Sequence, residues 1–293
     1  MRITNNILSQ NLLRNLETAQ GKMDQLQNQL STGLRISKPS DDPVGIENAM
    51  RLKSNISSVE QWKSNADSAL EYMNTSDSIL GDMTSMLQRV KELAVQGANG
   101  TLTTADKSVV ADEVDQIKDQ LKMMANTQVG SRYIFSGTAT DKELIPTDGS
   151  TSVANGNPVN FQVGNNKPVD ISVNGQTLFG DNTTGIIATL TNLSTALRAN
   201  NSTDINTALG TIDTNIDNVI AIRSELGART NRITAIRDQL DSTSTNLQQN
   251  LSDIQDADMA KTITDFTNQQ NTYKAALAVG AQIIQPSLVD FMK

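Results

Sequence analysis

The sequence contains neither cysteine nor histidine. Without Cys, disulfides, thiolate nucleophiles and cysteine-ligated metal sites are excluded. Without His, the commonest general base and the commonest metal ligand are both missing. Catalysis would have to rely on carboxylates or Lys. The composition therefore argues against an enzyme, and we expect no catalytic site, no metal site and no cofactor.

Aromatic residues are also scarce, at 3% of the chain, and hydrophobic residues reach only 37%. A compact core of this size normally uses more Phe, Trp and Tyr, because each buries a large area. A long helical bundle with a narrow seam needs only Leu, Ile, Val, Met and Ala. The composition therefore favours an elongated, helical protein.

The net charge is −8, which argues against a nucleic-acid partner because such a partner calls for a basic patch. No stretch approaches the roughly 18 consecutive apolar residues of a membrane span. The N-terminal "MRITNNILSQNLLRNLETAQ" lacks the charged segment and apolar run of a secretory signal peptide. We expect no membrane partner, and a chain that stays in the cytoplasm or leaves it without a cleaved signal.

Both ends of the chain carry apolar residues in alternating steps of four and three, typical of a coiled-coil seam. The N-terminal seam comprises Leu12, Leu16, Ala19, Met23, Leu26 and Leu30. The C-terminal seam comprises Met259, Ile263, Phe266, Gln270, Tyr273, Leu277, Gly280 and Ile284, beside a second row of Ala276, Val279 and Ile283. Pro286 is expected to kink or end the C-terminal helix, leaving Leu288 and Phe291 on a short last turn.

Longer seams occupy the interior. One runs from Leu52 to Ala94, interrupted by the polar residues Lys63, Asp77 and Thr84, and another holds one phase from Ile205 to Ile254. The second predicts a helix of about 75 Å at 1.5 Å per residue. A shorter helix is predicted over 105–127, after a turn at 97–103.

Between the two halves the composition changes to Gly, Asn and short β-like runs. These runs are "PVNFQV", "PVDISV" and "QTLF". The Asn-Gly steps in "ANGN" (154–157) and "VNGQ" (173–176) predict two-residue hairpin turns. We therefore expect a small β-rich insert.

The predicted fold is mainly α: an elongated bundle of long coiled-coil-like helices from both chain ends, with a small inserted β-rich domain. The N-terminal half comprises a terminal coiled-coil segment, 1–44, and a helical rod, 45–141. The β-rich insert covers 142–190. The C-terminal half comprises a rod, 191–254, and a terminal segment, 255–293.

Two groups of acidic residues could be metal or acid–base sites. Asp41 and Asp42 are adjacent, and neighbouring residues rarely converge on one ion, so helix capping near Pro43 is the favoured interpretation. "DIQDAD" at 253–258 lacks the glycine and terminal Glu of a calcium loop. A polar hinge between helices is the better interpretation.

The apolar terminal segments are the candidate functional surface. If the C-terminal helix packed only its first apolar row against one partner helix, its second row would remain in water. We expect the ends to be poorly ordered in the monomer and to fold when neighbouring subunits cover them, although an ordinary core helix is the simpler alternative. The predicted assembly interface is Leu12, Leu16, Met23, Leu26, Leu30, Ile263, Phe266, Tyr273, Leu277, Ile283, Ile284, Leu288 and Phe291.

Several segments resemble bacterial flagellins and their relatives. "STGLRISKPSDDPVG" at 31–45 is similar to the family's N-terminal signature, and its "PSDDP" is more like the hook–filament junction branch, the third hook-associated proteins. "MRITNN", "GSRYIFSGTATD" (130–141), "ELGARTNRITAIRDQL" (225–240) and "YKAALAVGAQIIQPSLVDFM" (273–292) also resemble the family. The likeness covers 1–141 and 205–293.

The resemblance implies a structural subunit of the bacterial flagellum that joins the hook side to the filament. It implies export without a cleaved signal peptide through the flagellar type III apparatus, an extracellular location, and self-association in a ring. The implied partners are a neighbouring hook-associated protein, flagellin, and a cytoplasmic secretion chaperone on the C-terminal helix. The alternatives are filament flagellin itself and a secreted surface adhesin that binds through the insert.

Overall fold

The computed structural model describes residues 2–146, 157–165, 168–180 and 185–284, with backbone only for 2–6 and 282–284. Its long helices are α1 (Arg2–Thr32), α2 (Pro43–Ala98), α3 (Thr104–Ala125), α5 (Gly185–Arg198), α6 (Ser202–Gln255) and α7 (Met259–Ile284). Shorter elements are α4 (Gly175–Phe179) and the strands β1 (Gln128–Val129), β2 (Arg132–Tyr133), β3 (Asn160–Gln162) and β4 (Pro168–Asp170). The chain divides into two compact units: a terminal unit of residues 1–58 and 243–293, and a central unit of residues 59–242.

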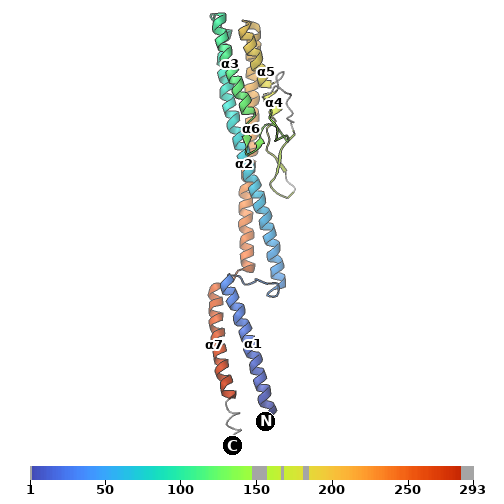
Figure 1. Cartoon of the computed structure of the whole chain (residues 1–293), viewed down its shortest axis with the longest axis vertical. Coiled ribbons are helices and arrows are strands. Elements are labelled where there is room, and N and C mark those ends of the chain that lie inside the picture. Colours follow the sequence, from blue (N-terminus) through green and yellow to red (C-terminus); the bar gives the residue numbers. More distant parts are fainter. Residues whose placement is uncertain (1, 147–156, 166–167, 181–184, 285–293) are drawn as a thin grey trace. The chain divides into compact units, whose positions relative to one another are not determined.

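The central unit is built on α2 and α6, which lie side by side (Figure 1). Each helix has a row of buried residues spaced seven apart, as in a coiled coil. The row on α2 is Val59, Ala66, Met73, Leu80, Leu87 and Ala94, and the row on α6 is Ile205, Ile212, Val219, Leu226, Ile233 and Leu240. Both long helices were predicted from these seams and are confirmed.

Ion pairs link the two helices along their length in antiparallel order. Lys63 pairs with Asp241, Asp67 with Arg237 at 2.6 Å, Asp77 with Arg223 at 2.8 Å and Lys91 with Asp213 at 2.6 Å. Two of the polar residues that interrupt the predicted seam, Lys63 and Asp77, are thus bonded across the helix pair. The third, Thr84, donates its hydroxyl to the Leu80 carbonyl one turn earlier, at 2.8 Å.

These ion pairs are expected to set the register of α2 on α6. A slip by seven residues would keep both buried rows in contact but would place Lys63 opposite Thr234 or Gln248. We expect Asp67→Arg to lower the Tm by a few degrees, because it sets two cations against each other. Combining it with Arg237→Asp should recover most of the loss. Thermal melts of the wild type, the two single variants and the double variant measure this coupling, and a double variant no better than the worse single variant would contradict it.

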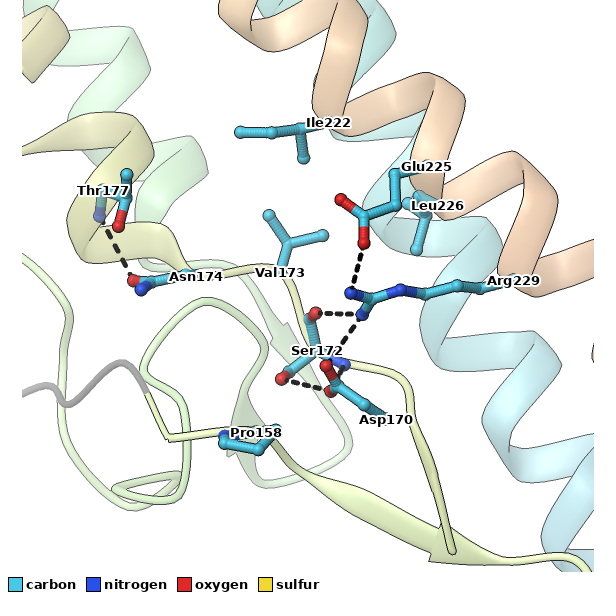
Figure 2. A pocket seen from close by; sticks show the side chains of 10 residues that line it. All are labelled: Pro158, Asp170, Ser172, Val173, Asn174, Thr177, Ile222, Glu225, Leu226 and Arg229. Carbon is cyan, nitrogen blue, oxygen red and sulfur yellow. Dashed lines mark hydrogen bonds and ion pairs between the residues drawn. The ribbon is translucent and has the colours of Figure 1, made fainter.

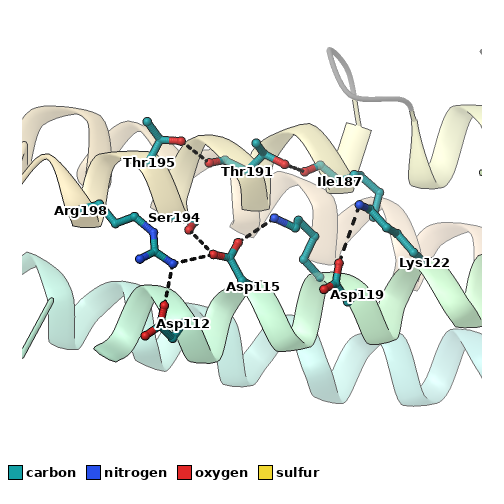
Figure 3. A network of polar contacts seen from close by, with 10 residues as sticks. Asp112, Asp115, Asp119, Lys122, Ile187, Thr191, Ser194, Thr195 and Arg198 are labelled. Carbon is teal, nitrogen blue, oxygen red and sulfur yellow. Dashed lines mark hydrogen bonds and ion pairs between the residues drawn. The ribbon is translucent and has the colours of Figure 1, made fainter. Parts of the chain in front are cut away.

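Helix α3 starts with a capping box, since Thr103 Oγ1 accepts from the Asp106 amide at 3.2 Å and Asp106 Oδ2 accepts from the Thr103 amide at 3.1 Å. The helix packs against α5 through the polar network of Figure 3. Asp115 accepts hydrogen bonds from Lys118 (2.6 Å), Ser194 (2.9 Å) and Arg198 (2.9 Å). The predicted helix over 105–127 is confirmed.

Acid is expected to weaken the contact between α3 and α5. Partial burial raises the pKa of Asp115, but the hydrogen bonds from Lys118, Arg198 and Ser194 outweigh it and lower the pKa to about 2. A carboxyl whose folded pKa lies below its unfolded value of 3.8 stabilises the fold above that pH and loses this contribution as the pH falls through about 2. Asp115→Asn should therefore lower the Tm by a few degrees at pH 7. Melts from pH 7 to pH 2 should show the difference from wild type shrinking, whereas a constant difference would argue against this role.

The insert packs its apolar side chains onto the central unit. The pairs β1–β2 and β3–β4 are antiparallel, with Phe161 opposite Val169 in the second. Ile171 and Phe179 are fully buried, and the Phe135 and Phe179 rings meet edge to face with centroids 5.2 Å apart. Residues 158–163 and 168–173 contain β3 and β4, as their patterns predicted.

The prediction of a hairpin at 173–176 is wrong. Asn174 caps α4 by accepting from the Thr177 amide at 3.2 Å, and "QTLF" forms a helix that buries Leu178 and Phe179. Asn is favoured at helix caps as well as in turns, so the local pattern did not separate the two. The other predicted turn, at 154–157, lies almost wholly outside the described residues.

The predicted helix cap is confirmed for Asp42, whereas Asp41 stabilises the loop before α2. Asp42 Oδ1 accepts from the Gly45 amide at 2.9 Å at the start of α2. Asp41 Oδ2 accepts from the amides of Lys38 (2.9 Å) and Ser37 (3.1 Å), which lowers its pKa. Within the described residues, no group of three or more Asp and Glu side chains is placed to hold a metal ion.

Candidate assembly interface

Helices α1 and α7 lie side by side in the terminal unit (Figure 1). All six residues of the predicted α1 seam are half-buried, and nearly all residues between them are exposed. Gln269 on α7 donates its side-chain amide to the Ala19 carbonyl at 3.2 Å. The predicted seam on α1 is therefore the face that α7 covers.

The face that α7 turns to α1 matches the predicted seam only in part: Phe266, Tyr273 and Gly280 are shared, whereas Met259, Ile263 and Leu277 are exposed. Its least exposed residues are Thr262, Phe266, Gln269, Tyr273, Ala276 and Gly280, again in steps of four and three, with Gln270 half-buried beside them. Gly280 is buried, and a Cβ built there would lie 2.7 Å from Leu12 Cδ2. Small residues at Ala276 and Gly280 let α1 approach closely at this end of the pair.

Apolar residues on both sides of this face of α7 are left exposed. Met259, Ile263, Leu277 and Val279 are 42%, 53%, 45% and 52% exposed. Three apolar residues of α1 are similarly exposed. We call these seven exposed residues, which lie on more than one side of the helix pair, the outer apolar surface: Ile7, Leu8, Leu13, Met259, Ile263, Leu277 and Val279.

The predicted interface residues thus fall into two groups. Leu12, Leu16, Met23, Leu26 and Leu30 on α1, with Phe266 and Tyr273 on α7, are half-buried in the helix pair. Ile263 and Leu277 belong to the outer apolar surface. Ile283 and Ile284 lie in the last turn of α7, where only the backbone is described, and Leu288 and Phe291 lie outside the described residues.

Charge is unevenly divided between the two units. The terminal unit holds ten Lys and Arg and ten Asp and Glu, so it is neutral. The central unit holds 14 basic and 22 acidic residues, so it carries the whole net charge of −8. A neutral surface with exposed apolar side chains favours association, whereas like charge opposes it. The terminal unit is therefore the part of the chain best suited to contact another copy.

The loop between α1 and α2 is hydrogen-bonded to the connection between α6 and α7. The Arg35 amide donates to the Gln255 carbonyl at 2.7 Å, and the Ala257 amide donates to the Gly33 carbonyl at 2.9 Å. The Arg35 guanidinium donates to the Ile254 carbonyl at 2.6 Å, and Gln255, which is buried, donates to the Ile36 carbonyl at 3.3 Å. The predicted polar hinge at 253–258 is thus a hydrogen-bonded joint, a long-range pairing that local sequence patterns could not reveal.

A groove of about 330 Å³ lies between the insert and α6 (Figure 2). Arg229 spans it, donating to Asp170 at 2.9 Å, to the Ser172 carbonyl at 3.2 Å and to Glu225 at 2.7 Å. Asp170 in turn accepts from the Ser172 hydroxyl at 2.8 Å. These polar groups satisfy one another, so the contact holds the insert against α6.

The arrangement defines a class of protein: a mainly helical protein whose helices α1 and α7 pair and leave apolar side chains exposed. Comparisons with known proteins agree with this class. Residues 3–140 match the bacterial flagellin N-terminal helical region, and residues 209–292 match the bacterial flagellin C-terminal helical region.

Whole-chain relatives belong to the same group. The chain is 30% identical to a flagellin of Bacillus subtilis, covering 97% of each chain. It is 26% identical to flagellar hook-associated protein 3 of Escherichia coli, covering 94% of this chain and 95% of that protein. The chain belongs to the bacterial flagellin family.

Solved structures share the fold. Bacillus cereus FlgL matches with a TM-score of 0.60 at 22% identity, covering 69% of this chain and 99% of that chain. Hook-associated protein 3 of Legionella pneumophila matches with a TM-score of 0.63 at 15% identity, covering 70% and 98%. The predicted fold class, long paired helices with a small β-containing insert, is confirmed.

Family membership gives the general role. Flagellin and hook-associated families consist of structural proteins, so this chain is a structural subunit of the flagellum and not an enzyme. In the part of the chain that the structure describes, no helix combines the length and apolar character needed to cross a membrane.

Proposed function

We propose that this chain joins the hook side of the flagellum to the filament, and that copies of it associate in a ring through their terminal helices. The outer apolar surface on the neutral terminal unit carries this proposal. Burying a fully exposed side chain of this kind is worth about 1.5–3 kcal/mol, and because these are about half exposed, covering one is worth roughly half of that. Seven of them supply a strong drive for neighbouring subunits to pack there.

The choice of the junction rests on two supports. The chain is similar to hook-associated protein 3 of Escherichia coli over nearly the whole of both proteins. The "PSDDP" segment also resembles the junction branch of the family. In this position the subunit would contact a neighbouring hook-associated protein on one side and flagellin on the other.

Export completes the proposal. The chain would leave the cell through the flagellar type III apparatus without a cleaved signal peptide and become extracellular. Before export, a cytoplasmic chaperone would cover the outer apolar surface of α7, because an exposed apolar row favours premature association.

Electron microscopy of a deletion strain tests the role. We expect hooks without filaments and flagellin released into the medium, with both defects reversed by the wild-type gene. Intact filaments on the deletion strain would contradict a junction role.

Filament flagellin is the second candidate, favoured by the 30% identity to the flagellin of Bacillus subtilis over 97% of each chain. The two roles differ in copy number. Quantitative mass spectrometry of sheared flagella should find this chain as a small fraction of the total if it forms a ring. Recovery as the main filament protein would replace the junction proposal with the filament one.

A further inference from the structure

Two Asn-Gly steps within the described residues have very different surroundings. Asn99–Gly100 lies in the turn directly after α2, and both residues are exposed. Asn174–Gly175 begins α4, where Gly175 is buried. From this contrast we propose that Asn99 is a site of spontaneous covalent modification, converted by water to aspartate or isoaspartate, while Asn174 is protected.

The reaction requires no enzyme. The backbone nitrogen of Gly100 loses its proton and attacks the side-chain carbonyl carbon of Asn99, a C–N bond forms, and ammonia leaves. The product is a five-membered cyclic imide. Water then adds to one of its two carbonyls and opens the ring, giving aspartate or isoaspartate. One water is consumed and one ammonia released, with no change in oxidation state.

The turn at Asn99 allows this ring to close. A Cβ built on Gly100 would meet no atom within 4 Å, so the attacking nitrogen belongs to an uncrowded residue. Among the described residues, none forms a hydrogen bond with the Asn99 side chain, whereas its amide donates to the Gln96 carbonyl at 3.2 Å. The side chain is thus free to rotate over the next peptide unit, and glycine gives that unit the backbone freedom that the ring needs.

The same dipeptide at 174–175 is held in a non-reactive arrangement. The Asn174 side chain accepts from the Thr177 amide at 3.2 Å, and ring closure would break this cap. A Cβ on Gly175 would collide with the Phe135 carbonyl oxygen, so the backbone has no room to turn. The reaction there requires α4 to open first, which slows it.

The modification changes the end of α2. Either product places a negative charge within the first residues beyond the C-terminus of α2, where the helix dipole already disfavours negative charge. The isoaspartate product also lengthens the backbone of the turn that leads to α3. Older copies of the protein would therefore carry an altered turn between α2 and α3. This inference does not depend on the proposed function.

Peptide mapping by mass spectrometry tests the proposal. The purified full-length chain is incubated at 37 °C and pH 8, sampled over time and digested, and deamidation is measured separately at Asn99 and Asn174. We expect Asn99 to react at least about tenfold faster, which corresponds to about 1.4 kcal/mol of extra barrier at Asn174. The rate at Asn99 should rise with pH, because the attacking nitrogen must lose a proton.

Two controls distinguish the effect of the fold on the deamidation rate from the effect of the Asn-Gly sequence itself. In concentrated urea the two sites should react at similar rates, since the cap on Asn174 is then lost. Gly100→Ala should slow the reaction at Asn99 severalfold in the folded chain without changing Asn174. Equal rates at the two sites in the folded protein, or a faster reaction at Asn174, would overturn the proposal.

Discussion

Leu277→Asp is expected to prevent incorporation into flagella while leaving the α1–α7 pair intact. Leu277 is 45% exposed on the outer apolar surface, so a carboxylate there stays in water in the lone chain. In the assembly we propose, the same carboxylate would be buried against a neighbour without a partner, at a cost of several kcal/mol. Each 1.4 kcal/mol is a factor of ten in affinity, so we expect a loss of at least about a hundredfold. Immunoblots of sheared flagella and swimming assays measure it.

Two further variants show which surface of the terminal helices is needed for incorporation into flagella. Thr264→Asp places the same charge on an exposed polar position of α7 and should assemble normally. Leu16→Asp places it in the half-buried seam on α1 and should separate α1 from α7, which circular dichroism would report as lost helix. Normal swimming of the Leu277→Asp strain would contradict the role given to the outer apolar surface.

The sequence predicted the central helices well because local periodicity identifies the buried face of each helix. Residues seven apart on α2 and on α6 have to lie on one face of each helix, whatever their partner. The polar residues that interrupt the seam were identified as well. Their partners were not, because Asp241 lies 178 positions from Lys63 and nothing local connects the two.

The terminal helices show where the same reasoning stops. Hydrophobic periodicity selected Phe266, Tyr273 and Gly280, which do face α1, but it also selected Met259, Ile263 and Leu277, which are exposed. The positions that complete the contact are Thr262, Gln269 and Ala276. Periodicity finds the most apolar face, and in a lone chain that face need not have its partner. If the proposed function is right, the apolar pattern of α7 reflects the contacts made in the assembly, whereas the structure shows only the contacts within one chain.

The contribution of the insert to the core of the central unit was not predicted, for a related reason. Its boundaries were set by composition at 142–190, which identified β3 and β4 but treated the segment as separable. Ile171, Leu178 and Phe179 are buried in the core of the central unit, and Arg229 fastens Asp170 to α6. Removing 142–190 is therefore a change to the central core as well as to the surface.

Backbone amides of α1 and α7 are expected to exchange with solvent at least about a thousandfold faster than those of α2 and α6 in the central unit. The central rows are at most 9% exposed, whereas the six seam residues of α1 are only half-buried. On the α7 side, Phe266 and Tyr273 are only half-buried, and the Thr, Gln, Ala and Gly residues beside them bury little apolar area. Opening the terminal pair thus costs far less than opening the central one. Hydrogen exchange followed by mass spectrometry measures both in one sample.

The same experiment on sheared flagella tests whether neighbouring subunits complete the packing of α1 and α7. If neighbouring subunits cover the outer apolar surface, amides of α7 should become protected in the assembly, while those of α2 around Leu80 change little. Protection of α1 and α7 in the monomer equal to that of α2 would show that the ends are already complete. The drive for assembly would then have to come from another surface.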